Sequence, residues 1–171
     1  MIGKNISLRA LEPSDSELLY LWENDPEVWI VSNTSAPYSQ FAIDQYILNS
    51  GDIYTSKQLR LMIILNEEPS TAVGAIDLFD FDPQNLRAEL GILIANDFRG
   101  RGFATEAIEL MKNYAFNTLN LHQLYAHIPC NKELNLHLFE KCGFVHTSTL
   151  KSWRRNNKTW LDEYVMQLIQ Q

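Results

Sequence analysis

The chain has 171 residues, a formal net charge of −7 and an apolar fraction of 46%. This length predicts one domain over residues 1–171, and the apolar fraction is typical of a folded chain rather than a disordered one. The acidic charge argues against nucleic acid and anionic membrane as general partners. No apolar run approaches the length of a membrane span, no signal-peptide pattern opens the chain, and two cysteines give no disulfide framework, so we expect a cytoplasmic protein.

The N-terminal third is predicted to hold one strand and two helices. Residues 6–11 alternate between apolar and polar side chains, as a half-buried strand does. A helix follows Pro13, with Ser14 and Glu17 as a capping box and residues 24–26 as its end. A second helix is expected from Ser39 to about Asn49, with its apolar side chains turned to the core: Phe41, Ile43, Tyr46 and Ile47.

The middle of the chain is predicted to form three antiparallel strands, over residues 59–65, 72–81 and 87–95. Turn residues separate them, and Gly74 inside the second marks a bulge or a close backbone approach. A helix from Ala104 to about Leu119 then leads to a strand over residues 122–129. Because a helix joins this strand to the one before it, the two are expected to be parallel.

The last segment is predicted to contain a helix from Glu133 to Cys142, with Gly143 as a left-handed C-cap. Residues 144–150 and 160–169 then form a hairpin whose turn lies at residues 154–157. The whole pattern is an α+β arrangement with a mixed, mostly antiparallel sheet and helices on both faces.

A glycine loop, residues 99–105, joins the central strand to the long helix. Without a Cβ, Gly100 and Gly102 let backbone amides approach an anion closely, and the first turn of a helix adds unpaired donors and a positive dipole end. Arg99 and Arg101 place two permanent positive charges on the same loop. This combination indicates a diphosphate site.

Two well-known phosphate loops do not fit this segment. A P-loop needs four residues between its glycines and a Lys-Ser/Thr pair after the second one. The dinucleotide fingerprint has Thr105 where a third glycine belongs, and residues 118–124 contain no carboxylate for a ribose. A turn with a purely structural role stays open as the alternative.

The loop resembles the acyl-CoA pyrophosphate loop of the GNAT N-acetyltransferases, which is written Gln/Arg-x-x-Gly-x-Gly/Ala and is matched by Arg99-x-x-Gly102-x-Ala104. Ordered motifs extend the resemblance from Ile6 to Tyr164, and they are similar above all to the ribosomal-protein-alanine/serine and spermidine N-acetyltransferases. These motifs are Arg87-Ala88-Glu89-Leu90-Gly91, Ala104-Thr105-Glu106-Ala107 and Leu138-Phe139-Glu140-Lys141-Cys142-Gly143-Phe144.

This resemblance implies a GNAT-like acyl-CoA N-acyltransferase fold, with acetyl-CoA as co-substrate beside a central, splayed parallel strand pair. No metal is implied. None of the four histidines has metal-ligand spacing or a recognisable triad partner, so all four are expected to be surface residues or satisfied core residues. The implied coenzyme-binding residues are Ile92, Leu93 and Ile94 through their backbone, then Arg99, Gly100, Arg101, Gly102, Phe103, Ala104, Thr105, Asn131, Asn135 and Phe139.

Glu89 is the candidate general base, since the resemblance puts it near the cleft and partial burial of a carboxylate raises its pKa toward neutrality. The alternative is a structural carboxylate paired with Arg87 or with a neighbouring strand. The general acid departs from the family pattern, because Phe139 stands where spermidine-acetyltransferase-like chains have Tyr. Water, no acid at all, or Tyr125 are the options that remain.

Other polar residues have two interpretations each. Asn131 either caps the helix that follows or bonds the pantetheine arm. The acidic residues near the expected acceptor side either attract a cationic amine or are solvated turn residues; they are Glu23, Asp25, Glu27, Asp77, Asp80 and Asp82. The basic hairpin turn at residues 154–158 is interpreted as a solvated tip rather than an RNA contact.

The sequence therefore predicts an enzyme that transfers acetyl from acetyl-CoA to a primary amine by direct attack in a ternary complex. The acceptor is a polyamine-like small molecule or a protein N-terminal amine, and a homodimer is left open. The alternatives are a non-catalytic acyl-CoA-binding or sensing module, favoured by Phe139, and a nucleotide-binding oxidoreductase.

Overall fold

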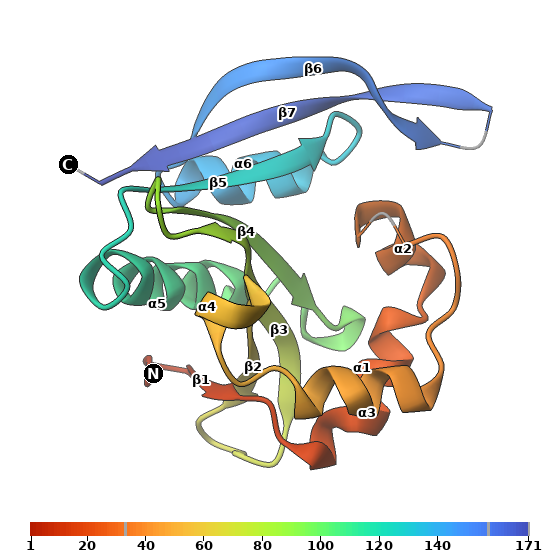
Figure 1. Cartoon of the computed structure of the whole chain (residues 1–171), viewed down its shortest axis with the longest axis vertical. Helices are drawn as coiled ribbons and strands as arrows, with labels where there is room; N and C mark the ends of the chain where they lie inside the picture. Colours follow the sequence, from red (N-terminus) through yellow and green to blue (C-terminus); the bar gives the residue numbers. More distant parts are fainter. Residues whose placement is uncertain (33, 157, 171) are drawn as a thin grey trace.

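The computed structural model describes residues 1–32, 34–156 and 158–170. Within these residues, seven strands form one sheet in the order β1-β2-β3-β4-β5-β7-β6 (Figure 1). All neighbours are antiparallel except β4 and β5, which run parallel as predicted. The strands are β1 (Ile6–Ala10), β2 (Leu59–Leu65), β3 (Ala72–Asp82), β4 (Arg87–Ile94), β5 (Gln123–Pro129), β6 (Val145–Asn156) and β7 (Thr159–Ile169).

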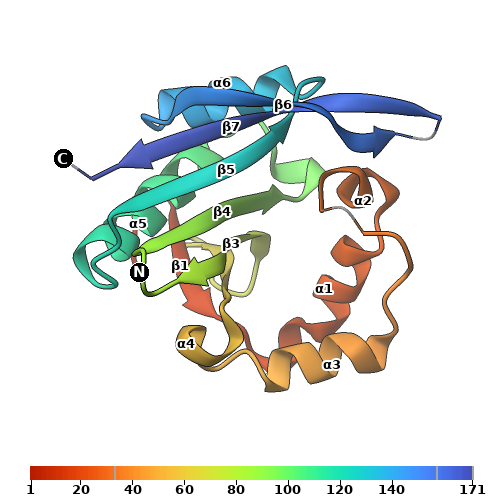
Figure 2. The ribbon, with the colours of Figure 1, turned by 45° about the horizontal axis from the view of Figure 1, so that its top comes forward.

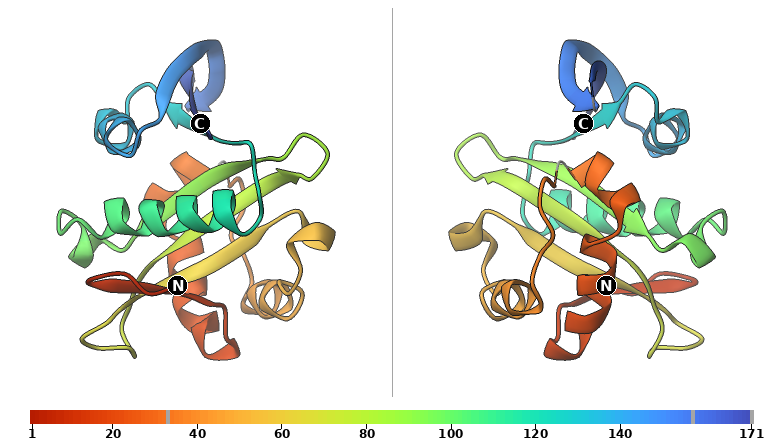
Figure 3. Two further views of the ribbon diagram at one scale, coloured as in Figure 1. Left: turned by 90° about the vertical axis from the view of Figure 1, so that its left-hand side faces the viewer. Right: turned by 90° about the vertical axis from the view of Figure 1, so that its right-hand side faces the viewer.

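Helices cover both faces of this sheet, which confirms the predicted α+β class. On one face, α1 and α3 bury Leu19 and Ile43 against Met62 of β2. On the other face, α5 and α6 pack over the larger core, and Figure 3 shows α6 and the β6–β7 hairpin stacked at the opposite end of the molecule from α1 and α3. The helices are α1 (Ser16–Glu23), α2 (Pro26–Ser32), α3 (Gln40–Leu48), α4 (Ile53–Ser56), α5 (Phe103–Asn117) and α6 (Glu133–Lys141).

The helix α5 owes its position to one apolar stripe. Ala107, Ile108, Met111 and Ala115 recur at helical spacing, and each is completely buried. Burial of a side chain as large as Ile108 or Met111 contributes about 1.5–3 kcal/mol. This packing holds the N-terminal end of α5, and with it the glycine loop, at the end of β4.

Two short helices were not predicted, and one predicted cap is wrong. Pro26 opens α2, where the carboxylate of Asp25 accepts from the amide of Glu27 at 2.8 Å, and Asp52 caps α4 in the same way. The first capping box pairs Glu12 with Asp15 around a 3-10 turn, not Ser14 with Glu17. The helices α2 and α4 each have only one or two turns, which is too short for an apolar periodicity to predict them.

Several local predictions are confirmed. A Cβ at Gly74 would lie 2.1 Å from the carbonyl oxygen of Leu93, and the β2–β3 register shifts beside it. Gly143 has φ +90° just after α6, as the left-handed cap requires. The C-terminal hairpin forms with longer strands than expected; Asn157 of its predicted turn lies outside the described residues. Phe41 is 71% exposed, so its predicted core position is wrong.

Candidate active site

The parallel strands β4 and β5 separate part-way along their length. Their register pairs Arg87 with Gln123, Ala88 with Leu124 and Glu89 with Tyr125, and it ends there although both strands continue. Figure 2 shows the two strands running in the same direction and diverging toward their C-terminal ends. The splayed pair that the resemblance implies is therefore present, and the side of β4 beyond Glu89 is named the open edge below.

Hydrogen-bond alternation decides which backbone groups point to the open edge. The amide of Ala95 donates to the carbonyl of Val73 at 2.9 Å, and β4 stays in register with β3 from there. Alternate residues of an antiparallel pair share such bonds, so Leu93 pairs with β3 while Ile92 and Ile94 direct their N–H and C=O groups away from it. Of the three backbone positions predicted for the coenzyme, these two line the open edge.

The glycine loop follows a 3-10 turn over residues 96–98 and leads into α5. Gly100 and Gly102 have φ of +75° and +85°, values that side chains disfavour, and a Cβ on either would meet no atom within 4 Å. Glycine is thus required here for backbone shape, and the space above the loop is open.

The first turn of α5 carries unused donors. Gly102 occupies the N-cap position without a side-chain cap, and the first bond into the helix runs from the Glu106 amide to the Gly102 carbonyl at 3.2 Å. Within the described residues, no protein carbonyl accepts from the amides of Phe103, Ala104 or Thr105. Unpaired amides at a helix N-terminus suit a phosphate group.

Both arginines of the loop are tied to it through backbone carbonyls. Nε of Arg99 donates to the Ile94 carbonyl, and Nη2 of Arg101 donates to the Asp97 carbonyl, each at 2.9 Å. The guanidinium of Arg101 also lies 5.3 Å from the ring centre of Phe98. Both side chains are exposed, so each holds a positive charge beside the open amides, as the predicted diphosphate site needs.

Glu89 lies where the ladder ends, and its partner is on the neighbouring strand. Its Oε1 accepts from the backbone amide of His127 at 3.3 Å and lies 2.9 Å from Nδ1 of that ring. In a continued parallel ladder, the His127 amide would bond the Leu90 carbonyl, so the carboxylate replaces that bond. Arg87, the other partner considered, pairs with Asp82 at 3.3 Å instead.

His127 is paired with Glu89, a contact that was not predicted from the sequence. The hydrogen bond to Glu89 raises the pKa of His127 above its ordinary value of 6.5, although burial opposes this. Glu89 and His127 are 38 residues apart in the chain. The signal that could have found the pair is the predicted parallel register together with side-chain alternation along β5.

Tyr125 lies on the same face, opposite Glu89 in the register and edge-on to His127 with ring centres 5.6 Å apart. Burial and the charge of Glu89 raise the pKa of Tyr125 to about 12. Its phenol therefore stays protonated at neutral pH, and the raised pKa makes it a weaker acid than a free tyrosine. This geometry favours Tyr125 among the general-acid options.

The structure corrects two residues near α6. Phe139 is 5% exposed and packs edge-on against Phe144, so the hydrophobic core holds its ring and a coenzyme contact finds no support. Helix α6 begins at Glu133 with Lys132 in the N-cap position, so Asn131 does not cap it. Asn131 is exposed and Asn135 half-buried at this helix start, and their predicted bond to the coenzyme stays a prediction.

Of the six acidic residues predicted for the acceptor side, Asp25 caps α2 and Glu27 lies 3.8 Å from Nη1 of Arg99, and the other four divide into two groups. Asp77 and Glu23 both pair with the guanidinium of Arg60, which lies over the ring of Tyr46. Burial lowers the pKa of Arg60, but the two carboxylates raise it above its usual value. Asp80 is exposed within β3, and Asp82, the last residue of β3, accepts the amides of Gln84 and Asn85 and pairs with Arg87.

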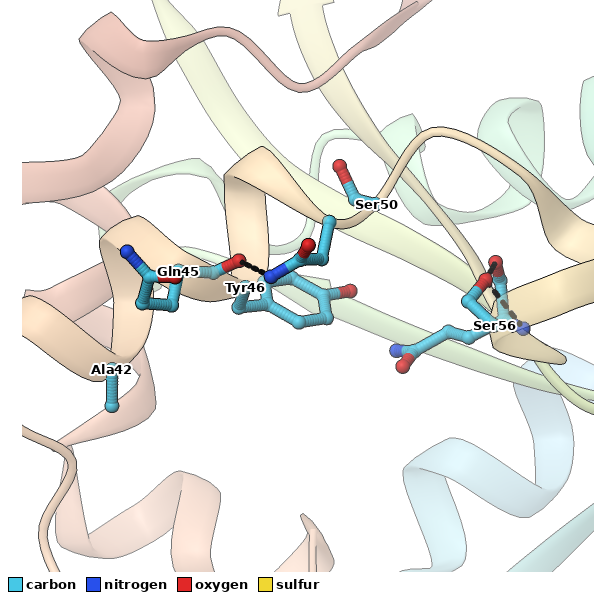
Figure 4. A pocket seen from close by; sticks show the side chains of 7 residues that line it. Ala42, Gln45, Tyr46, Ser50 and Ser56 are labelled. Atoms are coloured by element: carbon cyan, nitrogen blue, oxygen red, sulfur yellow. Dashed lines mark hydrogen bonds between the residues drawn. The ribbon is translucent and has the colours of Figure 1, made fainter.

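A shallow pocket of about 330 Å³ lies elsewhere, between α3 and the start of β2 (Figure 4). Its lining is mostly amide and hydroxyl side chains, and none of it comes from the glycine loop or the open edge. Among the described residues, no helix is long and apolar enough to cross a membrane. The same residues contain no group of three or more His, Cys, Asp or Glu side chains arranged to hold a metal ion.

Comparison with known proteins agrees with this geometry. The family model described as "Acetyltransferase (GNAT) domain" matches residues 5–145. The spermidine N(1)-acetyltransferase of Vibrio cholerae is 28% identical over 152 residues, which cover 87% of this chain and 84% of that protein.

Solved structures give the same result. A crystal structure of spermidine N-acetyltransferase from Vibrio cholerae in complex with CoA and spermine aligns with a TM-score of 0.89 and 25% identity, over 98% of this chain and 97% of that one. A dodecameric structure of that enzyme aligns with a TM-score of 0.81 and 26% identity, over 98% and 95%. The chain therefore belongs to the GNAT acetyltransferase family and is an acetyl-CoA-dependent N-acetyltransferase.

Proposed function

We propose that the chain transfers the acetyl group of acetyl-CoA to a primary amine of a polyamine-like small molecule, by direct attack in a ternary complex. The observation that carries this proposal is the alignment of three features along one line: open amides at the start of α5, the open edge of β4, and Glu89 where the β4–β5 ladder ends. The relative that is named for spermidine, and its structure with CoA and spermine, support the choice of donor and acceptor.

The glycine loop binds the phosphates in this proposal, and the pantetheine arm lies along the open edge. Backbone groups of Ile92 and Ile94 pair with that arm, and Arg99 and Arg101 add charge. The remaining contacts are proposed from the resemblance, at Gly100, Gly102, Phe103, Ala104, Thr105, Asn131 and Asn135. The thioester then lies near Glu89, which favours loss of a proton from the amine, while Tyr125 protonates the leaving sulfur.

The test is release of free thiol from acetyl-CoA with a panel of acceptors: spermidine, spermine, simple diamines and peptides with free N-termini. We expect amine-dependent thiol release that is fastest with a polyamine, and a gain of about 42 Da on the product. Faster release with peptides would favour the protein N-terminal amine instead. No binding of acetyl-CoA or CoA at micromolar concentration in calorimetry would refute the proposal.

Binding without turnover on every acceptor would favour the non-catalytic acyl-CoA-binding module instead. The homodimer and the cytoplasmic location stay predictions; light scattering checks the first of them.

A further inference from the structure

Two side chains that can accept a proton, Glu89 and His127, lie where β4 and β5 separate, and they differ in their exposure to solvent. The side chain of Glu89 is 12% exposed and that of His127 is 28% exposed. One carboxylate oxygen of Glu89 already accepts from the His127 amide at 3.3 Å and faces Nδ1 of its ring at 2.9 Å. A molecule that approaches from solvent therefore reaches the imidazole more easily than the carboxylate.

The pairing also decides which ring nitrogen is basic. A carboxylate only accepts hydrogen bonds, so Nδ1 of His127 must carry the proton and donate it to Oε1 of Glu89. In the neutral ring, the free electron pair then belongs to Nε2. Within the described part of the chain, no protein group forms a hydrogen bond with Nε2, which leaves this atom available to a substrate.

We infer that His127 is the catalytic residue that takes the proton from the substrate ammonium group, through Nε2, while Glu89 orients its ring and stabilises the imidazolium. This inference rests on the proposed function, because it assigns a role within that acetyl transfer. One N–H bond of the ammonium breaks and its proton moves to Nε2. The amine electron pair forms the C–N bond and the C–S bond breaks. Tyr125 gives its proton to the leaving thiolate and takes up the second amine proton, while His127 releases its own proton to water.

Charged groups on every neighbouring strand act on this ring. Glu89 on β4 and Glu163 on β7 both favour the protonated form of His127, whereas Arg154 on β6 opposes it. Nε of Arg154 donates to the buried Glu163 at 3.1 Å, so the positive charge of Arg154 largely offsets the negative charge of Glu163. Tyr125 on β5 remains uncharged at neutral pH. Glu89 is thus the main group that makes His127 a stronger base than a free histidine.

The first experiment compares His127→Asn with His122→Asn, which changes an exposed histidine just before β5. In an asparagine the amide nitrogen stands where Nδ1 was, so the bond to Glu89 is kept and the base is lost. We expect His127→Asn to lower kcat about 100-fold at pH 7, as removal of a general base does, with KM for acetyl-CoA within about twofold of the unchanged chain. His122→Asn should leave both values unchanged.

The second experiment follows pH, and it needs no His127 variant to fold. A base works in its neutral form, so kcat/KM should rise with pH through the pKa of His127, read independently by NMR of the ring. Glu89→Gln should move both the rate profile and the ring titration to lower pH. A His127→Asn variant with more than half of the original kcat, or a rate profile that does not follow the ring titration, would overturn the inference. An unchanged chain that releases no thiol with any amine would refute the acetyl-transfer proposal itself, so the two failures can be told apart.

Discussion

The two ends of the open edge are built in opposite ways. At one end, the glycine loop is a single continuous segment whose shape depends on the positive φ of Gly100 and Gly102 and on the start of α5. At the other end, Glu89 and His127 come from two strands and meet only because the parallel register brings them together. Residues of the glycine loop can therefore be changed one at a time, whereas any change that shifts the β4–β5 register would separate Glu89 from His127. Variants at the two ends should therefore separate coenzyme binding from chemistry.

The largest effect is expected from Gly102→Glu. A side chain at φ +85° strains the backbone, and a carboxylate would occupy the open space where phosphate is expected. We expect the Kd for CoA to rise more than 100-fold in calorimetry. Gly102→Ala carries the strain without the charge and should raise Kd about tenfold or less. Retained tight binding by Gly102→Glu would contradict the assignment of the glycine loop.

A smaller effect is expected from the double substitution Arg99→Ala with Arg101→Ala. Exposed charge contacts contribute about 0.5–1 kcal/mol each, and the backbone amides remain, so Kd for CoA should rise roughly tenfold. Binding by the unchanged chain should also weaken as salt increases, and the double variant should lose most of that dependence. Lys158→Ala, an exposed cation near the hairpin tip, is the matched control and should bind as before. If the Kd for CoA depended on salt equally in the double variant and in Lys158→Ala, the arginines would not face the phosphates.

The same contrast explains what the sequence could predict. The strand over residues 59–65 and the helix capped by Ser39 match the structure because their apolar pattern and caps are local. The glycine loop was predictable for the same reason. The pairing of Glu89 with His127 was missed because it depends on the end of the β4–β5 ladder, which no local pattern encodes.

Phe139 is the opposite case: the sequence motif assigned it to the site, but the structure places it in the core. A motif position assigned it to the site, but a motif gives the identity of a residue and not its burial. The core between α6 and the sheet holds this ring against Phe144. Its place in the family pattern therefore says little about what it does in this chain.

The smallest effect on catalysis is expected from Phe139→Tyr, which restores the residue that the family pattern would use as the acid. Because the ring is 5% exposed and packs on Phe144, the new hydroxyl is buried rather than presented to the thioester. An unpaired buried hydroxyl costs about 1–3 kcal/mol, which for a domain of this size lowers Tm by several degrees. We therefore expect kcat within about twofold and a measurable loss of Tm. By contrast, Tyr125→Phe removes a hydroxyl near Glu89 and should lower kcat more than it lowers Tm. A tenfold rise in kcat with unchanged Tm would contradict this expectation, because the new hydroxyl would then have to reach the leaving sulfur. The general acid would in that case belong to the motif around residue 139, and not to Tyr125 on β5.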